Sequence, residues 1–264
     1  MLYDSFFKEI FDPDVKPERL EELLSLLLKQ RVKILKVLPN DSTRIADESS
    51  LLIMDIVVQL EDGSIANVEC QRIGYKFPGQ RSACYSADLL LRQYKRVRGE
   101  KGKKFSYKDI KKVYSIIFYE QSPKEFHAFP NDSIHYSKQK TNTGVEVELL
   151  QEFLFIPLDI MKKIYENNGI RNKLEAWLIF LSDDNPETII RLLEEYPEFR
   201  EMYEEVYDSE TGEWVVTEVV DTKTFDYTVG ATAEEEQEII RPNTILSIII
   251  GLFQELLKLL GIGG

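Results

Sequence analysis

The chain has 264 residues, of which 43% are hydrophobic and 11% aromatic, so it can bury a sizeable core and is expected to be globular. Two cysteines are too few for a disulfide framework, and the two histidines have no cysteine neighbours, which argues against a zinc site. As an average, the formal net charge of −13 argues against nucleic-acid binding, but the distribution of charge along the chain matters more.

The N-terminal region predicts two helices and a strand. Residues 3–11 and 16–29 have helical patterns, the second with Pro17 near its start and a leucine-rich face, and residues 32–37 read as a strand. Charged residues interrupt the first apolar positions. No signal peptide is therefore expected, and the protein is expected in the cytoplasm.

The next segment, residues 51–72, predicts a β-hairpin. Residues 51–60 and 64–72 are strand-like, and Glu61, Asp62 and Gly63 between them suit a three-residue loop with Gly63 in the left-handed conformation. A shorter, two-residue Asp-Gly turn is the alternative. The choice between the two turns changes the register by one residue, and with it the face on which each side chain lies.

This register decides whether two acidic residues meet. The three-residue loop places Asp55 opposite Glu69, on one face together with Gln71, whereas the two-residue turn would pair Asp55 with Cys70. A carboxylate within a strand costs free energy unless it is paired or binds a metal, and a pair of carboxylates suits Mg²⁺. An ordinary polar face on a half-exposed sheet is the alternative interpretation.

A long helix is predicted at residues 80–97. One stripe is apolar at helical spacing and is expected to pack on the sheet; it consists of Ala83, Ala87, Leu90, Tyr94 and Val97. The other face is expected to lie toward the acidic pair; it carries Arg81, Tyr85, Asp88 and Arg92.

The charge is divided between two regions. Residues 92–112 contain ten basic and two acidic residues, which predicts either a local phosphate-binding patch or a solvated helix end. Residues 191–238 contain sixteen acidic and three basic residues, so this region alone carries the net charge of the chain. The rest of the chain is close to neutral. The positive charge of residues 92–112, the basic patch, is therefore not cancelled by its neighbours in sequence.

The second half is predicted to be mostly helical. Residues 113–119 form an apolar, central strand, and residues 147–156 a further strand, before helices at residues 159–165, 172–181 and 186–196. After residue 207 the pattern changes to a β-hairpin (213–221 and 223–229), an acidic run and a final helix at residues 244–260, which is short for a membrane span. We therefore expect one domain over residues 1–208 and an appended segment over residues 209–264.

The motif Asp55-(thirteen residues)-Glu69-x-Gln71 on a hairpin, followed by a helix and a strand, resembles the PD-(D/E)XK nuclease superfamily. The nearest resemblance is to its bacterial recombination-promoting nuclease and putative transposase group, whose N-terminal helix resembles YDSFFKEIF at residues 3–11. The resemblance covers roughly residues 1–207. Gln71 stands where the superfamily usually has Lys, and Met54 where it has Pro.

The resemblance implies an α/β fold with a restriction-endonuclease-like core, in which helices flank a mixed central sheet, together with a helical C-terminal half and an appended tail. It implies a Mg²⁺-dependent DNA endonuclease, with Mn²⁺ as a substitute. Asp55, Glu69 and the Cys70 carbonyl would hold the metal, and Gln71 would orient the attacking water. Because Gln71 is neither charged nor a strong base, modest activity is expected.

The resemblance and the basic patch together imply contacts with DNA phosphates. The expected contact residues are Arg81, Tyr85, Arg92, Lys95, Arg96, Lys101, Lys103 and Lys104. A second hypothesis is a catalytically weak or inactive binding or assembly module that keeps the nuclease fold and acts through its tail. In either case the C-terminal helix is expected to form a homo-oligomer, and membrane contact is not expected.

Overall fold

The structure is a computed structural model, and it describes residues 4–39, 54–74, 79–205, 207–208 and 213–214. The chain divides into two compact units, residues 1–183 and 184–264. This division precedes the predicted boundary after residue 208. Because the tail after residue 214 lies outside the described residues, the predicted hairpin strand at 223–229, the acidic run and the final helix stay predictions.

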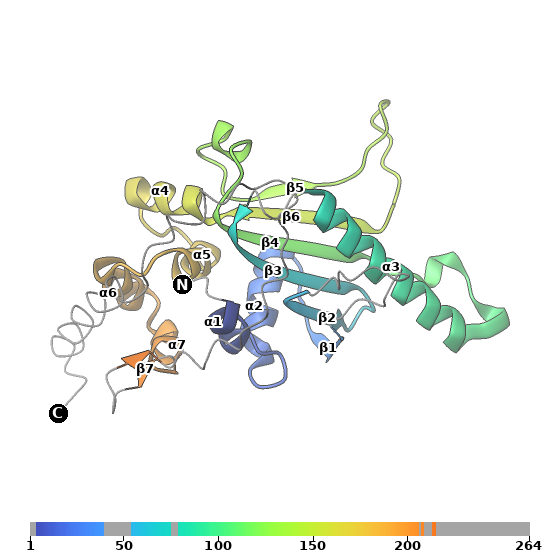
Figure 1. Cartoon of the computed structure of the whole chain (residues 1–264), viewed down its shortest axis with the longest axis horizontal. Coiled ribbons are helices and arrows are strands. Elements are labelled where there is room, and N and C mark those ends of the chain that lie inside the picture. The colour runs from blue at the N-terminus through green and yellow to red at the C-terminus, as the bar shows by residue number, and fades with distance from the viewer. Residues whose placement is uncertain (1–3, 40–53, 75–78, 206, 209–212, 215–264) are drawn as a thin grey trace, which may run out of the picture. The chain divides into compact units, whose positions relative to one another are not determined.

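The first unit is built on one six-stranded sheet, drawn across the centre of Figure 1. The strand order is β1 (Ile34–Val37), β2 (Ile56–Leu60), β3 (Ile65–Ile73), β4 (Val113–Gln121), β6 (Gln151–Pro157) and β5 (His135–Ser137). β3, β4 and β6 run parallel, and the other neighbours are antiparallel. The predicted mixed central sheet is therefore confirmed.

Helices flank this sheet, as expected for a restriction-endonuclease-like α/β core. The first unit contains α1 (Asp4–Ile10), α2 (Pro17–Leu28), α3 (Gly79–Lys101), α4 (Leu158–Asn168) and α5 (Lys173–Ser182), with short 3₁₀ turns η2 (Gly102–Lys104), η3 (Tyr107–Asp109) and η4 (Phe126–Ala128). The second unit contains α6 (Pro186–Glu195), η5 (Pro197–Phe199), α7 (Arg200–Glu205) and a short hairpin of β7 (Tyr207–Asp208) and β8 (Glu213–Trp214). Within the described ranges, no helix is long and apolar enough to cross a membrane.

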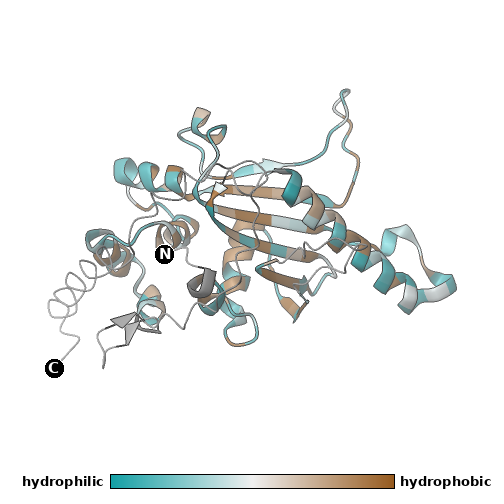
Figure 2. Ribbon diagram, in the orientation of Figure 1, coloured by the Kyte–Doolittle hydropathy of each residue, from teal (hydrophilic) through white to brown (hydrophobic). Residues whose placement is uncertain are grey.

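Both faces of the sheet are covered, which explains the nearly continuous apolar strands (Figure 2). On one face, α1 packs its buried Phe7 ring 6.0 Å from the ring of Phe118 in β4. On the other face, Tyr85 and Leu89 of α3 join a buried cluster with strand residues such as Ile117. The face that carries the acidic pair is therefore an interior face beneath α3 and not a solvated one.

The prediction of which face of α3 packs on the sheet is wrong. Ala83 and Ala87 are exposed, and the buried face instead carries Ser82, Tyr85, Ser86, Asp88, Leu89 and Gln93. Besides Tyr85 and Leu89, polar side chains take part in this contact: Gln151 donates to Ser86 Oγ at 3.0 Å, and the Gln93 amide hydrogen-bonds with both the N–H and the carbonyl of Lys111. Hydrophobic spacing misplaces this face because four of its six buried residues are polar.

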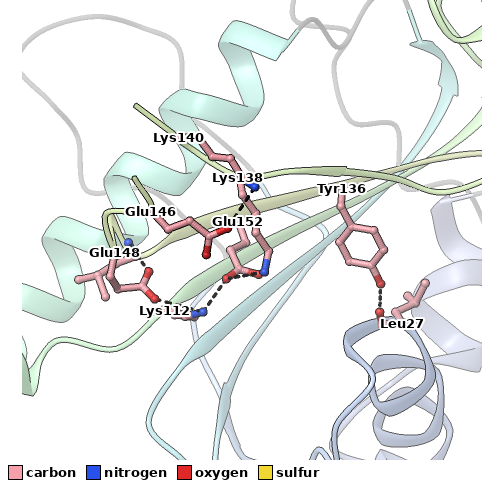
Figure 3. Close-up of polar contacts among 9 residues, drawn as sticks. Leu27, Lys112, Tyr136, Lys138, Lys140, Glu146, Glu148 and Glu152 are labelled. Carbon is pink, nitrogen blue, oxygen red and sulfur yellow. Dashed lines mark hydrogen bonds and ion pairs between the residues drawn. The ribbon is translucent and has the colours of Figure 1, made fainter. Parts of the chain in front are cut away.

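On the face opposite α3, ion pairs link neighbouring strands of the sheet (Figure 3). Lys112 Nζ lies 2.6 Å from Glu152 Oε1 and 3.2 Å from a Glu148 carboxylate oxygen, and Lys138 Nζ lies 3.8 Å from the same Glu152 oxygen. The hydrogen bond to Glu152 is the main cause of a raised Lys112 pKa. Lys112, Lys138 and Glu152 line a pocket of about 350 Å³. Lys112, counted in the basic patch, is therefore neutralised locally.

Candidate active site

The hairpin that carries the acidic residues has the three-residue loop predicted from its turn chemistry. Gly63 has φ of +89°, its N–H donates to the Leu60 carbonyl at 2.9 Å, and the Leu60 N–H donates to the Ser64 carbonyl at 2.9 Å. The register pairs Ile56 with Val68, which places Asp55 opposite Glu69. The alternative two-residue turn is excluded.

Asp55 lies just before β2, and its side chain hydrogen-bonds the neighbouring strand β3. Its Oδ2 accepts a hydrogen bond of 2.8 Å from the Cys70 N–H of β3, and its Oδ1 lies 3.4 Å from Lys8 Nζ of α1. In an extended strand the N–H and C=O of one residue point to the same side, so the Cys70 carbonyl is directed toward Asp55. The Asp55 carboxylate and the Cys70 carbonyl are both oxygen donors of the kind that hard cations prefer.

Glu69 has a buried carboxyl group, with only 1% of its surface exposed. Burial raises its pKa well above the ordinary value, and the neighbouring Asp55 charge raises it further, while a hydrogen bond with Asn67 and the Arg81 charge act in the opposite direction. Its Oε1 has no hydrogen-bond partner, and neither does the buried Oδ1 of Asn67. A divalent cation would satisfy such an oxygen and remove the repulsion between the carboxylates.

The donor set therefore fits a hard divalent ion. Among the described residues no three His, Cys, Asp or Glu side chains cluster, so the protein side chains on offer are the Asp55 and Glu69 carboxylates. Mg²⁺ is commonly held by one or two carboxylates, with water and substrate oxygens completing its shell. The carboxylates and the Cys70 carbonyl are hard oxygen donors, which suit Mg²⁺ or Mn²⁺ and not a soft metal.

Gln71 and Arg81 lie beside this pair. The Gln71 amide nitrogen is 3.5 Å from Glu69 Oε2, and Gln71 is half-buried on the same face of β3. Arg81, at the start of α3, donates to the Tyr85 hydroxyl at 2.9 Å and 2.7 Å and lowers the pKa of Glu69. Since Tyr85 is fully buried, its hydroxyl positions Arg81, and the guanidinium is the group that can approach a phosphate.

The remaining predicted DNA contacts fall into two groups. Arg92 pairs with Asp88 at 2.6 Å, Arg96 donates to Gln59 at 2.8 Å, and Lys101 pairs with Asp109 at 2.5 Å. The exposed side chains outside these contacts are Lys95, Lys103 and Lys104. This second group is the one most accessible to a polyanion.

Lys8 is a neighbour of Asp55 that the sequence pattern does not indicate. It is half-buried in α1 and brings a positive charge to within 3.4 Å of Asp55. It lies within YDSFFKEIF, the segment that carried the N-terminal resemblance. Its place in that segment was the only indication in the sequence that Lys8 could matter. The contact with Asp55 joins residues 47 positions apart and therefore depends on the tertiary fold.

The raised pKa of Glu69 predicts a pH-dependent stability of the metal-free protein. A carboxyl with a raised folded-state pKa stabilises the fold fully below its unfolded pKa, and this contribution is lost as pH rises through the folded-state pKa. The unfolding midpoint in EDTA should therefore fall over that interval in wild type and fall less in Glu69→Gln. Thermal unfolding at a series of pH values tests this; parallel curves for the two proteins would contradict it.

Three comparisons with known proteins complete the description. The family model for the PD-(D/E)XK nuclease family transposase matches residues 1–222, which is most of the chain. No curated protein and no solved structure matched. The matched range includes the hairpin with Asp55 and Glu69, the whole sheet and all the described helices. The chain therefore belongs to the PD-(D/E)XK nuclease family transposases.

Proposed function

We propose that this protein is a Mg²⁺-dependent DNA endonuclease that hydrolyses phosphodiester bonds, with Mn²⁺ as a substitute ion. The observation that carries the proposal is the buried Glu69, whose Oε1 lacks a hydrogen-bond partner, placed by the hairpin register opposite Asp55. Family membership supports the same reaction class. A divalent ion at these carboxylates would lower the pKa of a bound water and neutralise charge on the scissile phosphate.

The chain's own residues would divide the remaining tasks by charge and position. Gln71 can hydrogen-bond the attacking water through its amide, but it carries no charge. Lys8 supplies a positive charge beside Asp55, and Arg81 supplies another beside Glu69. We propose that Lys8 provides the electrostatic stabilisation that Gln71 cannot, because fixed charges near a reacting phosphate stabilise charge that develops there.

Conversion of supercoiled plasmid to the open-circular form tests the function. The full chain should nick plasmid in Mg²⁺ or Mn²⁺ and should not do so in EDTA. Asp55→Asn, prepared in parallel, controls for a contaminating nuclease, because it should show no activity. A wild-type protein that binds DNA but leaves plasmid intact in both metals would refute the endonuclease.

The second candidate is a DNA-binding or assembly module without useful catalysis. The observation in its favour is Gln71 at the position where the superfamily usually has Lys. In this case, the proposed homo-oligomer through residues 244–260 would be the functional element. The plasmid assay separates the two candidates directly.

Substitutions at Gln71 test its role in the reaction. Gln71→Lys should preserve or raise the single-turnover cleavage rate, because it adds charge on the same strand face. Gln71→Ala should lower the rate, since it removes the amide that orients water. Single-turnover kinetics on a plasmid substrate provide the measurement. An unchanged rate for Gln71→Ala would make this residue merely part of the strand face.

A further inference from the structure

The end of α3 and the two 3₁₀ turns after it carry a cluster of three aromatic rings; we call residues 94–109 the tip. The ring of Tyr94 stacks on that of Tyr107, with centroids 6.0 Å apart and an interplanar angle of 11°. Phe105 meets both rings edge-to-face, at 5.5 Å and 5.4 Å. Despite these contacts, 75% of the Tyr107 surface remains exposed. A ring already held in place thus presents much of its surface to solvent.

Local hydrogen bonds fix the backbone that carries this ring. Ser106 and Asp109 form a capping box around η3, which begins at Tyr107. Asp109 also pairs with Lys101 at 2.5 Å, which ties η3 to the last turn of α3. The chain reverses at Gly102, whose φ is +52°. Because these bonds orient the ring in the free protein, little ordering entropy is lost when it contacts a ligand.

Positive charge surrounds the rings. Arg98 lies over the Tyr94 ring, 5.5 Å from its centroid, and hydrogen-bonds the Tyr94 hydroxyl. Lys95, Lys103 and Lys104 are exposed. Within residues 92–112 the two acids are Glu100 and Asp109, and Asp109 is engaged within the tip. The tip therefore complements a polyanion that also offers flat, apolar faces.

We propose that the tip binds an unpaired stretch of DNA, with a base stacked on Tyr107 and phosphates near Lys103 and Lys104. The inference rests on the proposed DNA substrate and adds a preference for single-stranded or locally unpaired DNA. Bases inside a duplex are stacked on one another, so a ring that enters the duplex must first unstack them, whereas an unpaired base offers its face without this cost. Lysines alone could bind the phosphates of a duplex, whereas the aromatic rings favour an unpaired strand.

The position of the tip defines where the unpaired stretch would lie. Figure 1 shows the end of α3 and the segment after it projecting beyond the strands. Arg81, beside the candidate site, and Arg98, in the tip, are seventeen residues apart on α3, which corresponds to about 25 Å of helix. The stacked base is therefore several nucleotides from the phosphodiester at the acidic pair. A strand that is unpaired on one side of the cut would reach both.

Fluorescence anisotropy in EDTA tests the inference without cleavage, using a 20-nucleotide oligothymidine and a 20-base-pair duplex. Tyr107→Ala should weaken binding of the single strand about tenfold and binding of the duplex less than twofold, because base stacking contributes about 1–3 kcal/mol per base. Tyr107→Trp should keep single-strand affinity. Phe129→Ala, which removes another exposed ring outside the tip, should leave both affinities unchanged.

Charge reversal separates backbone contacts from stacking. Lys103→Glu with Lys104→Glu should weaken both DNA forms and flatten the dependence of log affinity on log salt by about one unit per lost contact. Equal losses on both DNA forms for Tyr107→Ala, no loss at all, or a wild type that binds neither DNA would each overturn the inference. A protein that fails to cleave but shows the Tyr107 preference would refute the endonuclease and retain the inference.

Discussion

Replacing Glu69 with Gln is expected to reduce Mg²⁺-dependent plasmid cleavage by at least about 10²–10³-fold, the loss typical of removing one electrostatic group from a reaction centre. Gln keeps the shape of the side chain but removes the charge of one proposed metal ligand. The same change should stabilise the metal-free protein, because a buried carboxylate beside Asp55 is replaced by a neutral group. Cleavage assays and thermal unfolding in EDTA would measure both effects.

Asp55→Asn should abolish cleavage equally but should not raise stability in the same way. The Asp55 carboxylate accepts the Cys70 N–H and pairs with Lys8, so its charge already has partners in the metal-free protein. Glu61→Gln is a matched control, since Glu61 lies exposed in the loop of the same hairpin. Cleavage at the wild-type rate by either site variant, or a loss in the control, would refute the assignment of the site.

Replacing Lys8 with Met is expected to lower the cleavage rate about 10²-fold at saturating Mg²⁺. The ion pair with Asp55 places this charge at the proposed metal site, where it can act on a phosphate bound there. Because a cation next to a metal site opposes metal binding, the variant should also bind metal more tightly than wild type. The two effects have opposite signs, which a simple loss of folding would not produce.

The combination of Lys8→Met with Gln71→Lys sharpens this test. If Lys8 supplies the charge missing at Gln71, the added lysine on β3 should restore part of the lost rate. Lys163→Met is a control, because Lys163 is exposed on α4. Rate measurements over a Mg²⁺ titration would separate the effect on turnover from the effect on metal affinity. An unchanged rate in Lys8→Met would assign Lys8 a purely structural pairing with Asp55.

The hairpin register could be predicted because its determinants are local. Glu61, Asp62 and Gly63 select the turn, the turn sets the register, and strand alternation then fixes the face of Asp55 and Glu69. The order of elements and the mixed sheet followed from the strand and helix patterns together with the family resemblance. The register depends on neighbours in sequence, whereas the mixed sheet joins distant strands and was implied by the resemblance.

The features that could not be predicted depend on contacts between distant segments. The buried face of α3 includes Ser86 and Gln93 beside Tyr85 and Leu89, and a hydrophobic pattern assigns these two polar residues to solvent. Lys8 reaches Asp55 only because α1 packs against the sheet. Glu152 neutralises Lys112 across two strands, so a count of basic residues along the chain overstates the accessible charge.

Calorimetric titration of Mn²⁺ into the metal-free protein tests the metal site most directly, at a pH where Glu69 still holds its proton. Because the ion must displace that proton, wild type should bind one ion per chain with proton release, seen as a heat that changes with the ionisation enthalpy of the buffer. Glu69→Gln should lose both the binding and the proton release. Saturable binding in Glu69→Gln that matches wild type would contradict a metal site at Asp55 and Glu69.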